Sequence, residues 1–350
     1  MLLSGIMNKP GELRNVIFTP EEIAEATLRL VTERVKNPKA GLATGISGLD
    51  GTGRLLPMRP GELITVLGYT SHGKSSLANR IMRNNAAGII EAGEASSKAV
   101  VTVTWEQSIE EQGIYDVAYF SQISVEKMLS GTLDSSEIEK LIAACEQRKK
   151  VPWWLLGHSS AKEERRPRLT MWQVSEALFM LRNTFGVTPI LVVLDYLQRM
   201  NRQGLRGEMR EQYIQLVDDA KDLALSLSCP VILVSQTGRQ VHNREIGLPE
   251  LDDGQETSNL EQSSDKMLGT WLPKHKYADG KLIVIGSKGM LSSSFLMFIR
   301  IVKQRLGKAP LTMPFFFKPE INQLSQMEWL SDVELQEELA KIKKRGGRTK

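Results

Sequence analysis

A glycine-rich segment near residue 70 has the residue types and the spacing of a phosphate-binding loop. It runs from Gly68 through Gly73 and Lys74 to Ser75 and Ser76, and it fits the pattern G-x-x-x-x-G-K-[ST]. An apolar run precedes it and a helical pattern follows it, which is the context that such a loop requires. The glycines let backbone N–H groups surround phosphate oxygens, Lys74 reaches the β- and γ-phosphates, and the Ser75 hydroxyl binds Mg²⁺. These five residues are therefore predicted to bind ATP with Mg²⁺.

Three further apolar runs end near polar residues that a nucleotide-hydrolysing site needs. Asp195 ends one run, and we predict that it holds Mg²⁺ together with Ser75; the alternative is a carboxylate that only caps the next turn. Hydrolysis also needs a group that orients the attacking water, and Glu106 is one candidate among many. Gln236 ends another run, where its amide could contact the γ-phosphate and sense its loss.

Two cations, Lys303 and Arg305, stand one residue apart at the end of a later apolar run. Alternate residues of a strand face the same way, so both would lie on one face, an arrangement that suits a phosphate. The alternative is a turn exposed to solvent. His72 lies inside the glycine-rich loop and is expected to point away from the nucleotide rather than to act in catalysis.

The elements that must position these residues alternate in type along the chain. From Thr44 onward, short β-rich runs alternate with helical stretches, which is typical of an α/β fold with a parallel sheet covered by helices. Ligands of such sheets bind beyond the carboxyl ends of the strands, so polar residues at those ends should meet. The expected strands cover residues 63–67, 99–104, 190–194, 231–234, 282–285 and 295–302.

Composition excludes several classes of protein. Hydrophobic residues make up 41% of the chain and charged residues 25%, unlike a disordered chain, a collagen or a coiled-coil rod. No apolar run approaches the roughly 18 residues that span a bilayer, and the first residues lack the basic region of a secretory signal. We therefore expect a cytoplasmic protein with no membrane partner. Two cysteines, Cys145 and Cys229, are too few for a disulfide framework and are expected to be small core residues.

The basic charge is concentrated at the end of the chain. The formal net charge is +4, but residues 341–350 hold six basic and no acidic residues, which leaves −2 on the other 340 residues. Affinity for nucleic acid must therefore come from a local groove or from this tail, which we expect to be disordered.

Taken in order, these segments resemble the motor domain of DnaB-type replicative helicases. The resemblance covers roughly residues 20–325 and rests on the segments 44–50, 68–76, 105–108, 191–200, 230–239, 255–265 and 303–305. It implies a RecA-like P-loop ATPase with a mostly parallel central sheet flanked by helices. It also implies a hexameric ring that hydrolyses ATP between subunits and moves 5′ to 3′ on single-stranded DNA.

The resemblance assigns roles to individual residues. Glu106 becomes the residue that activates water, Gln236 the γ-phosphate sensor, and Lys303 with Arg305 the pair inserted into the neighbouring subunit's site. The chain is expected to divide into three segments: residues 1–43 as an arm with a linker helix, 44–330 as the motor domain, and 331–350 as a C-terminal helix with the basic tail.

The linker helix has its own start signal. Thr19 is the expected N-cap, Pro20 the first helical residue, and Glu22 completes a capping box. The narrow apolar stripe of this helix needs a surface, which is either its own domain or a neighbouring subunit. The resemblance favours the neighbouring subunit, because the family's linker helix docks on the adjacent motor.

The chain also departs from the family. The amino-terminal helical domain that contacts primase has no counterpart, because the sequence begins almost at the linker helix, so primase recruitment by the usual route is not expected. The presumed DNA loop lacks the family's Arg and Gly, which removes a phosphate partner and close backbone approach. Arg239 and Arg244 could compensate, or could lie in a solvated loop. The residues of the loop here are Gln255, Glu256, Thr257 and Ser258.

The predicted function is an ATP-dependent hexameric DNA helicase motor, with single-stranded DNA, further copies of the chain and a possible loader, replication or recombination partner. The alternative is a RecA-fold ATPase that acts as a nucleotide-gated adaptor or loader on DNA without unwinding. Glu106 and Arg305 favour turnover, whereas the altered loop favours the adaptor.

Overall fold

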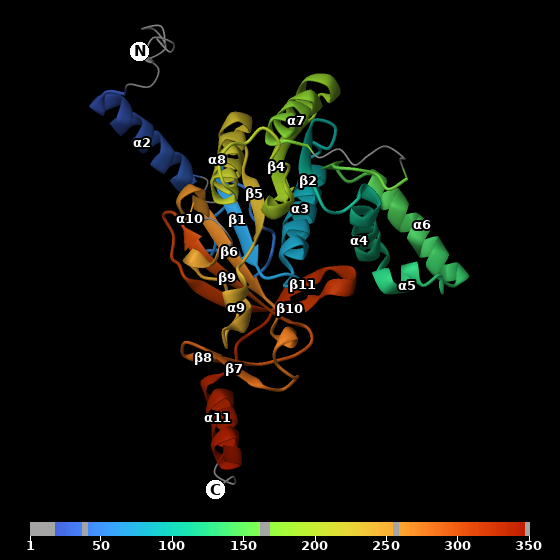
Figure 1. Cartoon of the computed structure of the whole chain (residues 1–350), viewed down its shortest axis with the longest axis vertical. Coiled ribbons are helices and arrows are strands. Elements are labelled where there is room, and N and C mark those ends of the chain that lie inside the picture. Colours follow the sequence, from blue (N-terminus) through green and yellow to red (C-terminus); the bar gives the residue numbers. More distant parts are fainter. Residues whose placement is uncertain (1–17, 37–40, 162–168, 255–258, 347–350) are drawn as a thin grey trace. The chain divides into compact units, whose positions relative to one another are not determined.

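The computed structural model describes residues 18–36, 41–161, 169–254 and 259–346 (Figure 1). Its contacts divide the chain into two compact units, Met1–Leu42 and Ala43–Lys350. Each unit is described by itself.

The first unit contains the helix α2 (Pro20–Lys36). Its capping box is confirmed: Glu22 N–H donates to Thr19 Oγ1 (3.2 Å), and Thr19 N–H donates to Glu22 Oε2 (2.6 Å). Ile23, Leu30 and Val31 are exposed, so the apolar stripe of α2 is available for docking. Docking on a neighbouring subunit remains a prediction.

The second unit is built on a nine-stranded sheet in the order β11-β10-β9-β6-β1-β5-β4-β2-β3. From β6 to β3, neighbouring strands run parallel, and β9, β10 and β11 add an antiparallel edge. The predicted α/β class with a mostly parallel sheet is therefore confirmed. The strands are β1 (Leu63–Gly68), β2 (Lys98–Thr104), β3 (Trp153–Leu156), β4 (Thr188–Asp195), β5 (Val231–Gln236), β6 (Lys266–Trp271), β9 (Leu296–Gln304), β10 (Leu311–Lys318) and β11 (Gln323–Gln326).

Helices cover both faces of the central strands, which explains why these strands read as continuous apolar runs. One face packs against α7 (Met171–Phe185) and α8 (Met209–Leu227), whose apolar residues share a core with alternate residues of β1, β2, β4 and β5. The helix α3 (Lys74–Glu91) contacts the same four strands but contributes no residue to that core. Side chains at the intervening strand positions, such as Ile64 and Val193, are also fully buried. Figure 1 shows these helices beside the sheet.

Two expected strands differ from the prediction. Residues 282–285 form β7 (Leu282–Ile285), which pairs with β8 (Lys288–Leu291) in a separate hairpin instead of joining the main sheet. Only Gly286 and Ser287 connect them, and Gly286 has φ of 62°, as a tight hairpin turn requires. The strand expected at 295–302 is β9, but it runs antiparallel to β6, because that hairpin rather than a crossover helix connects the two.

The hairpin has its own small core. Trp271, Phe298 and Met290 are buried there, with Trp329 packed against them. The other helices of the second unit are short or peripheral: α4 (Ile109–Ser121), α5 (Val125–Leu129), α6 (Ser135–Lys149), α9 (Arg239–Asn243), α10 (Asn259–Ser263) and α11 (Asp332–Gly346), with the 3-10 turns η1 (Leu197–Arg199), η2 (Leu251–Asp253), η3 (Pro273–His275) and η4 (Pro319–Ile321).

The prediction that residues 341–350 are disordered is wrong for the first part of this tail. The helix α11 continues to Gly346, and residues 347–350 lie outside the described part of the chain. Basic residues at a helix C-terminus complement the helix dipole, which favours continuing the helix into the basic segment.

The two cysteines differ in burial. Cys229 is buried, as expected, and burial raises the pKa of its thiol to about 12. Cys145 is exposed, so the expectation of a core residue is wrong there. Its neighbour Ala144 is the buried residue of α6, and the next position on a helix faces about 100° away. Within the described ranges, no helix is long and apolar enough to cross a membrane.

Candidate functional site

The glycine-rich loop joins the carboxyl end of β1 to the start of α3. Ser71 and Gly73 have φ of 63° and 80°, which turns the chain tightly before the helix. Gly73 is the N-cap of α3, and it provides no side-chain cap for the helix. The first N–H groups of α3 are therefore available for an anion, where the helix dipole adds positive potential.

Gly68 shows why a glycine is needed at the end of β1. A Cβ atom built there would lie 2.6 Å from Thr270 Oγ1 and 3.1 Å from the Thr270 carbonyl oxygen. Gly68 itself does not line the cavity formed by the loop, whereas Gly73, Lys74, Ser75 and Ser76 do. Its part in the predicted site is to let β6 approach the loop closely.

Lys74 is largely buried at the base of this cavity. Its Nζ donates a hydrogen bond to the Tyr69 carbonyl oxygen (2.9 Å). Burial lowers the pKa of Lys74 to about 8, while the negative charges of Asp195 and Glu106 act in the opposite direction. The ammonium group is thus poorly solvated, and a phosphate oxygen would provide a stronger partner than the carbonyl.

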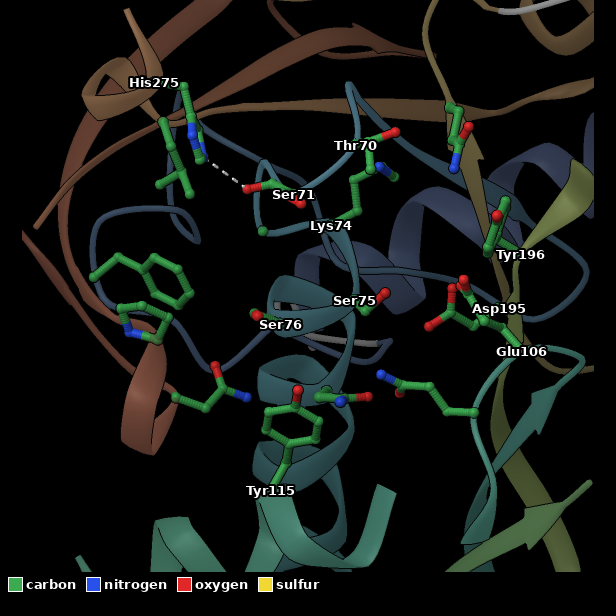
Figure 2. Close-up of a pocket in the computed structure, with 18 of the residues that line it drawn as sticks. Thr70, Ser71, Lys74, Ser75, Ser76, Glu106, Tyr115, Asp195, Tyr196 and His275 are labelled. Carbon is green, nitrogen blue, oxygen red and sulfur yellow. Dashed lines mark hydrogen bonds between the residues drawn. The ribbon is translucent and has the colours of Figure 1, made fainter. Parts of the chain in front are cut away.

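Asp195 ends β4 and is the buried acid of the site. Burial raises its pKa to about 6, and the hydrogen bond from the Ser75 side chain lowers it. Its Oδ1 atom is buried and has no hydrogen-bond partner among the described residues. Figure 2 shows Ser75 facing Asp195, with Glu106 beside it. A carboxylate with an unpaired oxygen next to a serine hydroxyl fits the oxygen ligands that Mg²⁺ prefers.

Glu106 and Gln236 come from the strands on either side of β4. Glu106 lies two residues beyond β2 and is exposed to the cavity, and Gln236 ends β5. The next residue, Thr237, donates its backbone N–H to the Gly68 carbonyl (3.2 Å), which ties the end of β5 to the loop. The sheet therefore brings Lys74, Ser75, Ser76, Asp195, Glu106 and Gln236 into one cavity of about 760 Å³.

The cavity also contains residues that the sequence did not single out. Arg199 follows Asp195 within the same segment, whereas the residues from β10 and η4 are more than a hundred positions away, so only the sheet order reveals them. His72 does not line the cavity: its Nδ1 accepts the Leu272 N–H (2.9 Å), as expected for a side chain that points away from the nucleotide. The additional lining residues include Tyr115, Arg199, Lys274, His275, Phe317, Pro319 and Asn322.

The sequence of this chain matches a known family. The model of the DnaB-like helicase C-terminal domain matches residues 41–326. The chain belongs to this family. The match confirms the resemblance and, with the fold, the RecA-like P-loop architecture.

Curated relatives of this chain support its membership in the DnaB-like family. The replicative DNA helicase DnaB of Helicobacter pylori (strain 26695) is 22% identical over 291 residues, which are 81% of this chain and 56% of the relative. The same protein of Pasteurella multocida is 27% identical over 233 residues, 66% of this chain and 46% of the relative. The chain thus spans about half the length of the curated relatives that it matches.

Solved structures share the fold. A structure of a single ATPase domain superposes with a TM-score of 0.70 at 19% identity, covering 87% of this chain and 99% of that domain. A structure of a DnaB-like replicative helicase and its interactions with primase also gives 0.70 at 19% identity, covering 87% of this chain and 67% of that one.

Lys303 and Arg305 do not reach the cavity of their own chain. The antiparallel strand β9 ends where the parallel strands begin, since Gln304 pairs with Lys266, which pairs with Ile64. Lys303 Nζ donates to the Ser264 carbonyl (3.0 Å), and Arg305 forms an ion pair with Asp265 (3.2 Å). The two cations therefore lie beside the amino ends of the parallel strands, at the opposite end of the strands from the glycine-rich loop. The sequence predicted a strand end here but not the direction of the strand.

The predicted DNA-binding residues fall into three groups. Arg239 is exposed at the start of α9. Arg244 forms two hydrogen bonds with the buried carboxylate of Asp253 (2.6 and 2.7 Å), so DNA would have to compete with this pair. Arg239 is the first residue of α9 and Arg244 is its C-cap residue, and their contact with DNA remains a prediction. Gln255, Glu256, Thr257 and Ser258 lie outside the described residues.

Proposed function

We propose that this chain is an ATP-driven DNA helicase motor, with residues 44–330 as the motor domain. The observation that carries the proposal is the convergence of Lys74, Asp195 and Glu106 on one cavity at the uncapped start of α3. The relatives support DNA as the substrate, because they are named replicative DNA helicases. A loader or another replication or recombination protein is proposed as a further partner.

ATP would lie across the ends of several strands. The free N–H groups of α3 and the ammonium of Lys74 suit the phosphates. The strand order places β10 on the other side of β1 from β4 and β2. Phe317, Pro319 and Asn322 therefore line the end of the cavity away from Glu106, where they suit the nucleoside. The γ-phosphate would lie at the opposite end, near Glu106 and Gln236.

Ser75 and Asp195 are the residues that would hold Mg²⁺, because their oxygens face each other and one carboxylate oxygen lacks a partner among the described residues. Held there, Mg²⁺ would supply positive charge that offsets the negative charge of the phosphates during phosphoryl transfer. A cation would also remove the cost of keeping the Asp195 carboxylate ionised in a buried position.

Glu106 is positioned to act on water rather than on the bound phosphates. It would orient a water molecule and accept its proton as the water oxygen bonds to the γ-phosphorus. The bond between the γ-phosphorus and the β–γ bridging oxygen breaks, and ADP and inorganic phosphate leave. Gln236 would contact the γ-phosphate from the end of β5 and lose this contact after hydrolysis.

A ring is the assembly that best uses Lys303 and Arg305. They lie at the opposite end of the strands from the cavity, so they would serve the site of a neighbouring copy arranged head to tail. We propose a hexameric ring that encircles single-stranded DNA. Arg239 and residues 255–258 are the proposed DNA contacts, whereas Arg244 would act mainly through Asp253.

The deciding experiment measures ATP hydrolysis with and without single-stranded DNA, together with unwinding of a forked duplex. We expect turnover that DNA stimulates and unwinding that requires ATP. Stimulated turnover without unwinding would favour the nucleotide-gated adaptor. If neither ATP binding nor turnover is detected, the ATPase proposal is wrong.

A further inference from the structure

The cavity contains a cation, Arg199, that the proposed mechanism does not use. Arg199 ends η1, the 3-10 turn that directly follows β4. Its neighbours Leu197 and Met200 are buried in the main core, which fixes the turn. The intervening Arg199 is exposed and lines the cavity.

The sheet places Arg199 between two residues of the proposed γ-phosphate end. The strand order is β5-β4-β2, so Gln236, Arg199 and Glu106 follow three adjacent strands. Gln198 holds the turn against β5: its Oε1 accepts the Gln236 N–H (3.2 Å) and its Nε2 donates to Ser235 Oγ (3.1 Å). The position of Arg199 relative to Gln236 is therefore set by backbone and buried contacts, not by a flexible loop.

The guanidinium group of Arg199 retains most of its hydrogen-bonding capacity. Its Nε donates to the Tyr196 hydroxyl (3.2 Å), and within the described part of the chain it forms no ion pair with a carboxylate. The Tyr196 hydroxyl and, more weakly, the charge of Glu106 raise its pKa, so the group stays charged. A guanidinium has five N–H donors in a planar fork that matches phosphate oxygens.

We infer that Arg199 donates hydrogen bonds to the γ-phosphate of ATP bound to its own subunit and stabilises the charge on that group during hydrolysis. This inference rests on the proposed function, because it requires ATP in this cavity. This role differs from the roles of Lys303 and Arg305, which lie at the opposite end of the strands and would serve a neighbouring subunit. Arg199 would make part of the charge stabilisation independent of the subunit interface.

The first test compares nucleotides with and without a γ-phosphate. Arg199→Ala should weaken binding of the β,γ-imido analogue of ATP by roughly tenfold, with ADP binding nearly unchanged, because only the γ-phosphate loses a charge-assisted hydrogen bond. Turnover should fall on the order of 10²-fold, and Arg199→Lys should recover part of this loss. Arg206→Ala is the matched control, since Arg206 is exposed and outside the cavity. Equal effects on both nucleotides, or no effect, would overturn the inference.

The second test asks which subunit supplies the side chain. Arg199→Ala subunits mixed with Lys74→Ala subunits should recover no activity, because neither subunit then has a complete cavity. Recovery would show that Arg199 serves a neighbour. The binding test remains informative if the parental chain binds ATP but does not hydrolyse it, so failure of the proposed function and failure of this inference are distinguishable.

Discussion

Lys74 and Glu106 line the same cavity but meet the substrate at different stages. Lys74 would contact the phosphates in the bound ground state, whereas Glu106 would act on water only during reaction. We expect Lys74→Ala to abolish nucleotide binding or turnover, and Glu106→Gln to keep binding while turnover falls on the order of 10³-fold. Equilibrium binding and steady-state hydrolysis measure the two effects. Near-parental hydrolysis by Glu106→Gln would assign the role to another residue.

Asp195 should reduce the stability of the chain when no ligand is bound. Burial raises its pKa from 3.8 to about 6, so its contribution to folding is most favourable below pH 4 and is lost as the pH rises through 6. Asp195→Asn should therefore raise the free energy of unfolding by on the order of 1 kcal/mol at pH 8, and this gain should shrink at pH 5. The same variant should lose turnover, because an amide is a poor Mg²⁺ ligand.

Denaturant unfolding without nucleotide at the two pH values measures this effect. Asp265→Asn is an opposite control, because Asp265 forms ion pairs with Lys221 (2.7 Å) and Arg305 (3.2 Å) and should lose stability when neutralised. A loss of stability in Asp195→Asn at pH 8 would contradict the argument.

The phosphate-binding residues could be predicted because the chemistry is local. Gly73, Lys74 and Ser75 are consecutive, and the strand and helix around them leave few other arrangements. Arg199 carried no such signal, since an arginine after a strand is more often on the surface. Asn322 could not be predicted for another reason. It follows β10 and η4, and it lines the cavity because the strand order places β10 three strands from β1.

Strand direction was the main feature of the elements that the sequence did not determine. An apolar run from 295 to 302 predicts a strand whichever way it runs. Its direction depends on the connection from β6, where residues 272–295 contain the β7–β8 hairpin instead of the helix that a parallel crossover needs. The direction of β9 also determines whether Lys303 and Arg305 reach the cavity of their own chain, so the sequence could not predict their position.

Residues 237–254, which include α9 and η2, connect the end of β5 to the predicted DNA loop. Thr237 pairs with Gly254, and Arg244 holds Asp253, whose side chain is 1% exposed. Arg244→Ala leaves the buried Asp253 carboxylate without its cationic partner. We expect the free energy of unfolding to fall by about 2 kcal/mol and hydrogen exchange to become faster over residues 250–254. Arg239→Ala is the control, because its exposed side chain should affect DNA binding without changing hydrogen exchange.

Hydrogen–deuterium exchange and the salt dependence of DNA binding separate the two roles of Arg244. A phosphate contact would reduce the salt slope of binding by about one, with exchange unchanged. If Arg244→Ala gave that pattern, Arg244 would be a DNA contact rather than a brace for this segment.

The two ends of the strands carry complementary halves of the proposed ATP site. The carboxyl ends of the parallel strands carry the cavity, and the opposite end of the sheet carries Lys303 and Arg305. A contact that joins unlike surfaces repeats from copy to copy, and it closes into a ring when the rotation allows. The Asp265 carboxylate holds Arg305 in the single chain, so a neighbouring phosphate would have to compete with this ion pair.

Mixing two inactive variants tests whether Arg305 completes the site of a neighbouring copy. Arg305→Ala subunits keep their own cavity, and Lys74→Ala subunits keep Arg305, so an interface between them contains one complete site. We expect each variant alone to be nearly inactive and the mixture to recover part of the parental ATP hydrolysis, with a rate that depends on protein concentration. Arg199→Ala in place of Arg305→Ala should give no recovery. Turnover that is independent of concentration, or a mixture no more active than its components, would mean that each chain completes its own site.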